Sequence, residues 1–422
     1  MFVTVRRPLI ASVAALVCGP VLLFPGESVA HQTVAVADGP ECGAVSPDDD
    51  VERPVTGENT AMEALQVPQA WSEASKAGKR PGAGVTVVVV DSGITGVDER
   101  GPSPLKSAHG LIVGGIIAGP NQPKPAVSVG IAPGARMVDE PFYDVPRGEE
   151  QDGVRVPMSD ALEARLKAIT ARRRSGQLKG PTIVVVPMEV LHTDSLEKAV
   201  QALVASGALV IAAAGDRPAA DDSFLKSYAG ETAAPGEDAV ADVWPAGGDG
   251  VVSVGVSTPT DGVLRNSGID LAAPGTGSVS KALNGAWCVV TTVSSHWAAA
   301  QVAGVAAVVW SVHRSDTAQQ LEERLEGTAS GNSDGASPLT GYGVVQPVEA
   351  ILRDINGMGA EGHEADVVPR AKVPRERADL LADARENAVW WGLGGGGALV
   401  ILLVLRPVLA RRRAGGGSDV RR

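Results

Sequence analysis

Short apolar runs alternate with helical patterns along the middle of the chain. Residues 85–90, 183–186 and 208–214 are almost continuously apolar and rich in small or β-branched side chains, which is typical of parallel strands covered on both faces. Residues 159–172 and 195–205 carry apolar positions at helical spacing between these runs. The order predicts β-α-β units, and therefore an α/β fold with a doubly wound, mostly parallel sheet.

The amino terminus has the pattern of a secretory signal peptide. Arg6 and Arg7 precede an apolar stretch over 9–24, and small residues follow at 28–30. This pattern predicts export and cleavage before His31. An uncleaved membrane anchor is the alternative interpretation, although the apolar stretch is short for a membrane span.

The carboxyl terminus has a stop-transfer pattern. Residues 388–405 are uncharged and mostly apolar, and Arg406 and the arginines of 411–413 follow them. The pattern predicts a single transmembrane helix over 388–409, with the basic tail in the cytoplasm and the large domain outside the cell membrane. The alternative is a buried helix of a soluble domain.

Composition and charge narrow the class of function. The chain has 422 residues, of which 44% are hydrophobic and only 3% aromatic, and its formal net charge is −12. This length and hydrophobic content suit one large domain with appendages. The acidic balance excludes a nucleic-acid partner, because phosphate binding needs a basic face. No phosphate-binding or calcium-binding loop occurs in the sequence, so we expect no cofactor and no resident metal.

Three polar positions fall near the ends of predicted elements, where parallel sheets form their sites. Asp91 directly follows the valine-rich strand, and His109 begins a stretch of small and apolar residues. His296 lies just before the very apolar segment 305–310. Each of these residues alone has a plain structural explanation, as a turn residue or as a hydrogen-bonded residue at a helix start. Their chemistry is suggested only by their order along the chain.

That order resembles the catalytic order of the subtilase family of serine peptidases. Further stretches that match the family occur at 129–135, 212–216 and 271–275. Among subtilases, the chain is most similar to the mycosins, the membrane-anchored, protease-like components of actinobacterial type VII secretion systems. The evidence is an arm before the domain, the closing motif at 341–343, a linker and a tail anchor. The resemblance implies a subtilisin-like fold, partners among type VII secretion membrane proteins, and an exported peptide as a possible substrate.

The resemblance also divides the chain into six parts. They are a signal peptide (1–30), an N-terminal arm (31–80), a subtilisin-like domain (81–352), a linker and juxtamembrane segment (353–387), a transmembrane helix (388–409) and a cytoplasmic tail (410–422).

The resemblance implies that half of a catalytic relay is present. In that relay, Asp91 would orient His109, and His109 would accept the proton of the nucleophile. The other half departs from the family. His296 occupies the place of the nucleophilic serine, and Asp216 the place of the asparagine that donates a hydrogen bond to the oxyanion.

Both departures remove a function that the serine mechanism needs. An imidazole cannot replace the hydroxyl nucleophile without a different mechanism, and loss of the serine costs about 10⁶-fold in subtilisin-type enzymes. An ionised aspartate offers only hydrogen-bond acceptors and a like charge. Loss of the oxyanion donor costs about 3–4 kcal/mol of transition-state stabilisation.

Four functions are compatible with these residues. The first is an inactive subtilase kept as a scaffold in a secretion assembly, where His296 only fills space and hydrogen-bonds to Asp216 or His109. The second is an active serine endopeptidase that uses Ser295 or Ser294. In the third, Asp91, His109, His296 and Asp216 converge on a metal ion. The fourth is a module that binds exported peptides in the cleft without cleaving them.

Two cysteines remain after removal of a signal peptide. They are Cys42 in the arm and Cys288, eight residues before His296. In an oxidising compartment they are candidates for a disulfide, which would be worth about 5 kcal/mol in the chain-entropy model. Two free buried thiols are the alternative.

Overall fold

The computed structural model describes residues 36–50, 53–99, 101–146, 153–220, 224–331 and 336–354, and residue 405. The predicted signal peptide and transmembrane helix fall almost entirely outside these residues. Within them, no helix combines the length and apolar character that a membrane crossing requires.

A six-stranded parallel sheet forms the centre of the domain, in the order β4-β1-β5-β6-β7-β8. The strands are β1 (Thr86–Val89), β4 (Arg136–Asp139), β5 (Thr182–Val186), β6 (Leu209–Ala213), β7 (Val251–Val256) and β8 (Leu271–Ala273). The strand order places β1 in the interior of the sheet and carries the chain outward in both directions. This arrangement confirms the predicted doubly wound, mostly parallel sheet.

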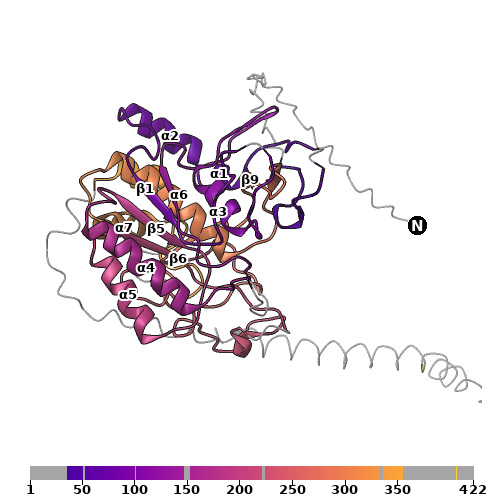
Figure 1. The fold of residues 1–422 in the computed structure, drawn as a ribbon, viewed down its shortest axis with the longest axis vertical. Coiled ribbons are helices and arrows are strands. Elements are labelled where there is room, and N and C mark those ends of the chain that lie inside the picture. Colours follow the sequence, from indigo (N-terminus) through magenta and orange to yellow (C-terminus); the bar gives the residue numbers. More distant parts are fainter. Residues whose placement is uncertain are drawn as a thin grey trace, which may run out of the picture.

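Helices cover both faces of the sheet (Figure 1). They are α1 (Thr60–Ala64), α2 (Val67–Lys76), α3 (His109–Ala118), α4 (Ser159–Arg174), α5 (Asp194–Val204), α6 (Ser295–Val312), α7 (Ala318–Thr328) and α8 (Pro347–Leu352). Two short 3₁₀ helices, η1 (Cys42–Ala44) and η2 (Lys226–Tyr228), complete the described helices.

The two faces of the sheet bury different side chains because strand residues point alternately to opposite sides. Val87 and Val89 pack into a core with α3 and α6, whereas Val88 packs into a second core with α4 and α5. All of β1 is therefore buried, which explains its continuous valine pattern. The observed bounds of β5, β6, α4 and α5 agree with the predicted segments to within two residues.

Helix α6 runs through the larger core and carries no charged side chain between Trp297 and Val312. It contacts β5, β6, β7 and β8 as well as α3. A helix that is apolar on all sides is stable in water only when it is buried all round. Because α6 is held on every side, its first turn is fixed relative to the ends of the strands.

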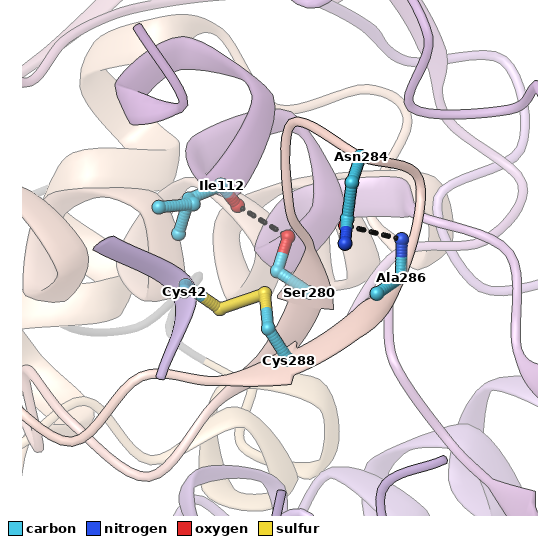
Figure 2. The surroundings of a disulfide bond; sticks show 6 residues. All are labelled: Cys42, Ile112, Ser280, Asn284, Ala286 and Cys288. Atoms are coloured by element: carbon cyan, nitrogen blue, oxygen red, sulfur yellow. Dashed lines mark hydrogen bonds between the residues drawn. A yellow bond between two sulfur atoms is a disulfide. The ribbon is translucent and has the colours of Figure 1, made fainter. Parts of the chain in front are cut away.

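Two antiparallel pairs lie outside the main sheet. They are β2 (Gln122–Pro123) with β3 (Ala126–Val127), and β9 (Val279–Lys281) with β10 (Trp287–Val289). Cys42 of η1 forms a disulfide with Cys288 of β10 (Figure 2). The backbone N–H of Val289 also donates to the carbonyl of Pro40, at 2.8 Å. The arm is therefore attached beside the strand that leads into α6.

Three acidic side chains approach one another between β8 and α7. Asp270 precedes β8 and accepts a hydrogen bond from the backbone of Ser253, and Glu322 and Glu326 lie on α7. Burial raises the pKa of Asp270 to about 7, and the charge of Glu322 adds to this. Burial, followed by the charges of Asp270 and Glu322, raises the pKa of Glu326 to about 8. Ionisation of this cluster therefore opposes folding.

The substitution Glu326→Gln is expected to stabilise the protein at alkaline pH. A carboxyl whose pKa is higher in the folded state costs nothing below its ordinary pKa and destabilises increasingly as the pH rises through the folded value. For Glu326, the interval from 4.5 to about 8 corresponds to about 5 kcal/mol. Urea unfolding at pH 9 should show this gain, and unfolding at pH 4 should show almost none.

The control for this prediction is Glu323→Gln on the same helix, where the side chain is exposed. We expect a much smaller change, because water already solvates that charge. Equal gains at pH 4 and pH 9 for Glu326→Gln would contradict ionisation as the cause.

Candidate active site

Asp91 and His109 are brought together at the carboxyl end of β1. Asp91 lies two residues beyond β1 and is fully buried, and His109 is the first residue of α3. The His109 Nδ1 atom lies 2.9 Å from both carboxylate oxygens of Asp91. Tyr143, which the sequence did not single out, donates its hydroxyl to Asp91 Oδ1 at 2.7 Å. The carboxylate thus holds the ring with Nδ1 protonated and Nε2 directed away.

His296 meets the other nitrogen of His109. Its Nδ1 atom lies 3.0 Å from His109 Nε2, and the two ring planes are nearly perpendicular, at 73°. Ser294 is the N-cap of α6, and its hydroxyl accepts the backbone N–H of His296 at 3.0 Å. Serine is a favoured N-cap residue because its oxygen satisfies a free backbone donor. The capped first turn therefore fixes the position of the His296 ring.

Glu189 completes a chain of four buried side chains. It follows β5 and is only 3% exposed, and its Oε2 atom lies 2.6 Å from His296 Nε2. The hydrogen bonds run from Asp91 to His109, then to His296 and finally to Glu189. Sequence analysis did not predict the contact of Glu189. An acidic residue just after a buried strand was the available signal, since the ends of β1 and β5 meet at one edge of the sheet.

The number of protons on the two imidazole rings follows from the geometry of these hydrogen bonds. His109 Nδ1 donates to Asp91, and His296 Nε2 donates to Glu189. The remaining 3.0 Å contact joins two ring nitrogens, and one of them must carry a hydrogen if they are to attract. The two imidazoles therefore hold three protons on four nitrogens and carry one positive charge. In this arrangement, His296 donates to the nitrogen of His109 that would otherwise act as a base.

The electrostatics place the positive charge on His296. Burial alone would lower the pKa of His296, but the charges of Glu189 and Asp216 outweigh burial and raise this pKa to about 9. Burial likewise opposes ionisation of Asp91, yet its pKa is lowered, because His109 and Tyr143 stabilise the carboxylate. At neutral pH, an imidazolium thus lies between buried carboxylates.

Asp216 and Ser295 bond to each other rather than to His109. The backbone N–H and the hydroxyl of Ser295 both donate to Asp216 Oδ1, at 2.8 and 2.7 Å. The Ser295 oxygen also accepts the N–H of Gly215 at 3.2 Å. In the part of the chain that the structure describes, neither Ser295 nor Ser294 hydrogen-bonds to His109. The second oxygen of Asp216 lies 3.8 Å from His296 Nε2.

The structure places all four candidate residues Asp91, His109, His296 and Asp216 in one neighbourhood. Hydrogen bonds join Asp91 to His109 and His109 to His296, whereas Asp216 Oδ2 lies 3.8 Å from His296 Nε2. No group of three or more histidine, cysteine, aspartate or glutamate side chains within the described residues is placed to hold a metal ion.

A cavity of about 280 Å³ lies beside the hydrogen-bonded pair of His109 and His296. Its lining includes His109, His296 and Asp216, together with Trp297 and with Glu41, the residue just before η1. The Trp297 ring packs against His109 with centroids 4.7 Å apart. The cavity thus adjoins three of the residues that the sequence predicted for the site.

The fold and the placement of Asp91 and His109 define a subtilisin-like architecture. A model of the subtilase family matches residues 82–343, which is more than half of the chain. The protein therefore belongs to the subtilase family.

Among its relatives is mycosin-1 from Mycobacterium tuberculosis (strain ATCC 25618 / H37Rv). It is 26% identical over 317 residues, which cover 65% of this chain and 70% of mycosin-1. The solved structure of the MycP3 protease from the type VII (ESX-3) secretion system is also 26% identical, with a TM-score of 0.52 over 76% of this chain and 92% of that chain. The chain is thus a mycosin-like subtilase.

A solved periplasmic assembly from the ESX-5 inner membrane complex contains a chain of the same fold. That chain is 23% identical, with a TM-score of 0.52, and the match covers 78% of this protein and 91% of that chain.

Proposed function

We propose that this mycosin-like subtilase is catalytically inactive and serves as a structural component of a type VII secretion apparatus. The observation that carries the proposal is the bond between His109 Nε2 and His296 Nδ1, at 3.0 Å. A serine peptidase needs this nitrogen to accept the proton of its nucleophile. Here it accepts a hydrogen bond from an imidazolium, so it has no lone pair free for a hydroxyl.

Asp216, at the position where the family has its oxyanion donor, supports the same proposal. Asp216 Oδ1 is held by two donors from Ser295, and its other oxygen faces His296. A carboxylate in this place repels the negative charge that develops on a peptide carbonyl during acyl transfer. Ser295 is an unsuitable substitute nucleophile, since its hydroxyl donates to Asp216 and, within the described residues, does not hydrogen-bond to His109.

The setting in a secretion apparatus rests on resemblance and on the two ends of the chain. The relatives include a protease of the ESX-3 system and a chain of the ESX-5 inner membrane complex. An apolar segment at 388–409, followed by arginines, would hold the domain at the outer face of the cell membrane. Its partners would then be the membrane proteins of that apparatus.

Activity-based labelling tests this proposal on the full-length chain. We expect a fluorophosphonate to label the protein no more than it labels a His109→Ala variant, because there is no activated hydroxyl to react. Labelling would be read by intact mass and by fluorescence in a gel. Stoichiometric labelling that His109→Ala abolishes would refute the proposal.

A further inference from the structure

A groove runs between α4 and α5, which lie side by side on one face of the sheet (Figure 1). Its volume is about 770 Å³. These two helices pack on the face of the sheet opposite α6, so the groove is separate from the cavity beside His296. Among the described residues that line it, three are cationic and none is acidic. The cations are Lys167, Arg174 and Lys198.

Two of these three cations have no partner of their own. Lys167 forms an ion pair with Glu163 on the same helix. Arg174 and Lys198 are exposed, and neither forms an ion pair or a side-chain hydrogen bond with any residue that the structure describes. The groove therefore holds positive charge that the described part of the domain does not use.

The fold uses the two arginines that precede Arg174. Arg172 forms an ion pair with Glu140, and Arg173 donates to the carbonyl groups of Gly180, Ser206 and Gly207. Arg174 has only the favourable position of a cation in the last turn of a helix. That explanation does not extend to Lys198, which lies in the middle of α5.

The spacing of the cations on α4 suits a helical ligand. Lys167 and Arg174 are seven residues apart on one face of the helix, which is about 10 Å along its axis. A ligand helix presents acidic residues at the same spacing when they are also seven positions apart. A strand instead places residues of one face about 7 or about 13 Å apart. Small side chains in the groove, Ala171, Ala199 and Ala202, leave room for a helix to approach.

The chain itself contains an acidic segment with this spacing. Residues 375–387, in the juxtamembrane segment, lie outside the described residues, so the spacing comes from the sequence alone. The acidic residues follow one another at intervals of three, four and three positions, which places them on one face of a helix. They are Glu376, Asp379, Asp383 and Glu386. Of the arginines in the segment, only Arg375 would share that face, at its start.

The linker before this segment is long enough to reach the groove. The described domain ends just after α8, and residues 355–374 can span up to about 65 Å when extended. A domain of this size has a radius of gyration of about 19 Å. The linker can therefore pass round the edge of the sheet to the α4–α5 face. A tether of this length also keeps the segment at a high local concentration.

We propose that the groove between α4 and α5 binds residues 375–387 of the same chain as a helix. The acidic face of the segment pairs with Arg174 and Lys198, and the alanines let it lie close to both helices. Because the predicted transmembrane helix begins at 388, docking turns the α4–α5 face toward the membrane. Docking does not depend on whether the former catalytic site is inactive.

Carbodiimide cross-linking of the full-length chain in detergent tests the proposal, because this reagent joins a lysine amine directly to a carboxylate. We expect Lys198 to be joined to Asp379 or Asp383 at least about tenfold more often than Lys79 is, as measured by mass spectrometry of the digest. Lys79 is exposed and follows α2, which contacts α8, where the linker begins. An undocked segment would meet it readily. Equal yields from the two lysines would overturn the proposal.

Isotope mixing shows whether the groove binds the segment of its own chain. Isotopically light and heavy chains are mixed before the reaction, and the cross-linked peptides are weighed. We expect pairs in which both peptides are light or both are heavy. Pairs of one light and one heavy peptide in statistical proportion would mean that the segment docks on a second copy, and would overturn docking within one chain.

Charge reversals that leave the reacting groups in place test the pairing. Arg174→Glu, and separately Glu376→Arg combined with Glu386→Arg, should each lower the yield from Lys198 several-fold, because like charges then face each other. Lys179→Glu is the matched control and should leave the yield unchanged, since Lys179 is exposed just beyond α4 and does not line the groove. An undiminished yield in Arg174→Glu would overturn the assignment to this groove, whatever the result of fluorophosphonate labelling.

Discussion

A chain with three substitutions, His296→Ser, Asp216→Asn and Glu189→Gln, is expected to react stoichiometrically with a fluorophosphonate, which should not label the natural chain. Serine at position 296 would place a hydroxyl near His109 Nε2, which is now 3.0 Å from the imidazole of His296. Asparagine at position 216 would supply the missing oxyanion donor. Glutamine at position 189 replaces a buried carboxylate whose hydrogen bond to His296 would be lost.

The expected gain is large because each change restores a separate part of one mechanism. The nucleophile accounts for about 10⁶-fold in subtilisin-type enzymes, and an oxyanion donor for about 10²–10³-fold. A variant that keeps Asp216 and carries only the other two changes should therefore react more slowly by about the latter factor. The initial rate of labelling, followed by gel fluorescence, measures both effects.

The control adds His109→Ala to the triple variant and should abolish the reaction, because Asp91 and His109 form the intact half of the relay. If the triple variant folds, as judged by circular dichroism, and still fails to react, the site lacks more than these three groups. Such a result would mean that the first turn of α6 cannot present a hydroxyl to His109.

His296 alone is expected to remove about 3 kcal/mol of stability as the pH rises from 6 to 10. Its pKa is raised from the ordinary 6.5 to about 9 in the folded protein. A group whose folded pKa is raised in this way stabilises fully below the unfolded value and loses that contribution as the pH passes through the folded value. The interval between 6.5 and about 9 corresponds to about 3 kcal/mol.

A His296→Gln variant isolates this contribution. Glutamine can still donate a hydrogen bond to Glu189 but cannot take up a charge. Denaturant unfolding of both proteins at pH 6, 8 and 10 should therefore show stability curves that converge at alkaline pH. The comparison between the two proteins matters, because ionisation of Asp270 and Glu326 destabilises both of them over part of the same range. Curves that stay parallel would contradict a charged His296.

The sheet could be predicted from the sequence because its signal is local. β1 is buried on both faces, so every position from Thr86 to Val89 is restricted in the same way and the pattern is continuous. Asp91 and His109 were found for a related reason, since each stands at the end of an apolar element. The order of the motifs then led to the subtilase family.

The contacts of the site could not be predicted in the same way, because they join segments that are far apart in the chain. Glu189 and His296 are 107 residues apart, and His109 and His296 are 187 residues apart. No periodicity links such positions. The bond from Ser295 to Asp216 depends on the direction of a hydroxyl in the first turn of α6, which only the three-dimensional arrangement determines.

The disulfide has a topological consequence for this chain. It joins Cys42 to Cys288 across a sequence separation of 246 residues, so the arm from Cys42 onward and the strands β1 to β9 lie on one covalent ring. Helix α6, with His296, lies on the segment that leaves the ring. A protease that cuts once between the two cysteines opens the ring but releases no fragment until a reductant breaks the sulfur–sulfur bond. In an oxidising compartment, the arm and the helix that carries His296 thus remain parts of one molecule after such a cut.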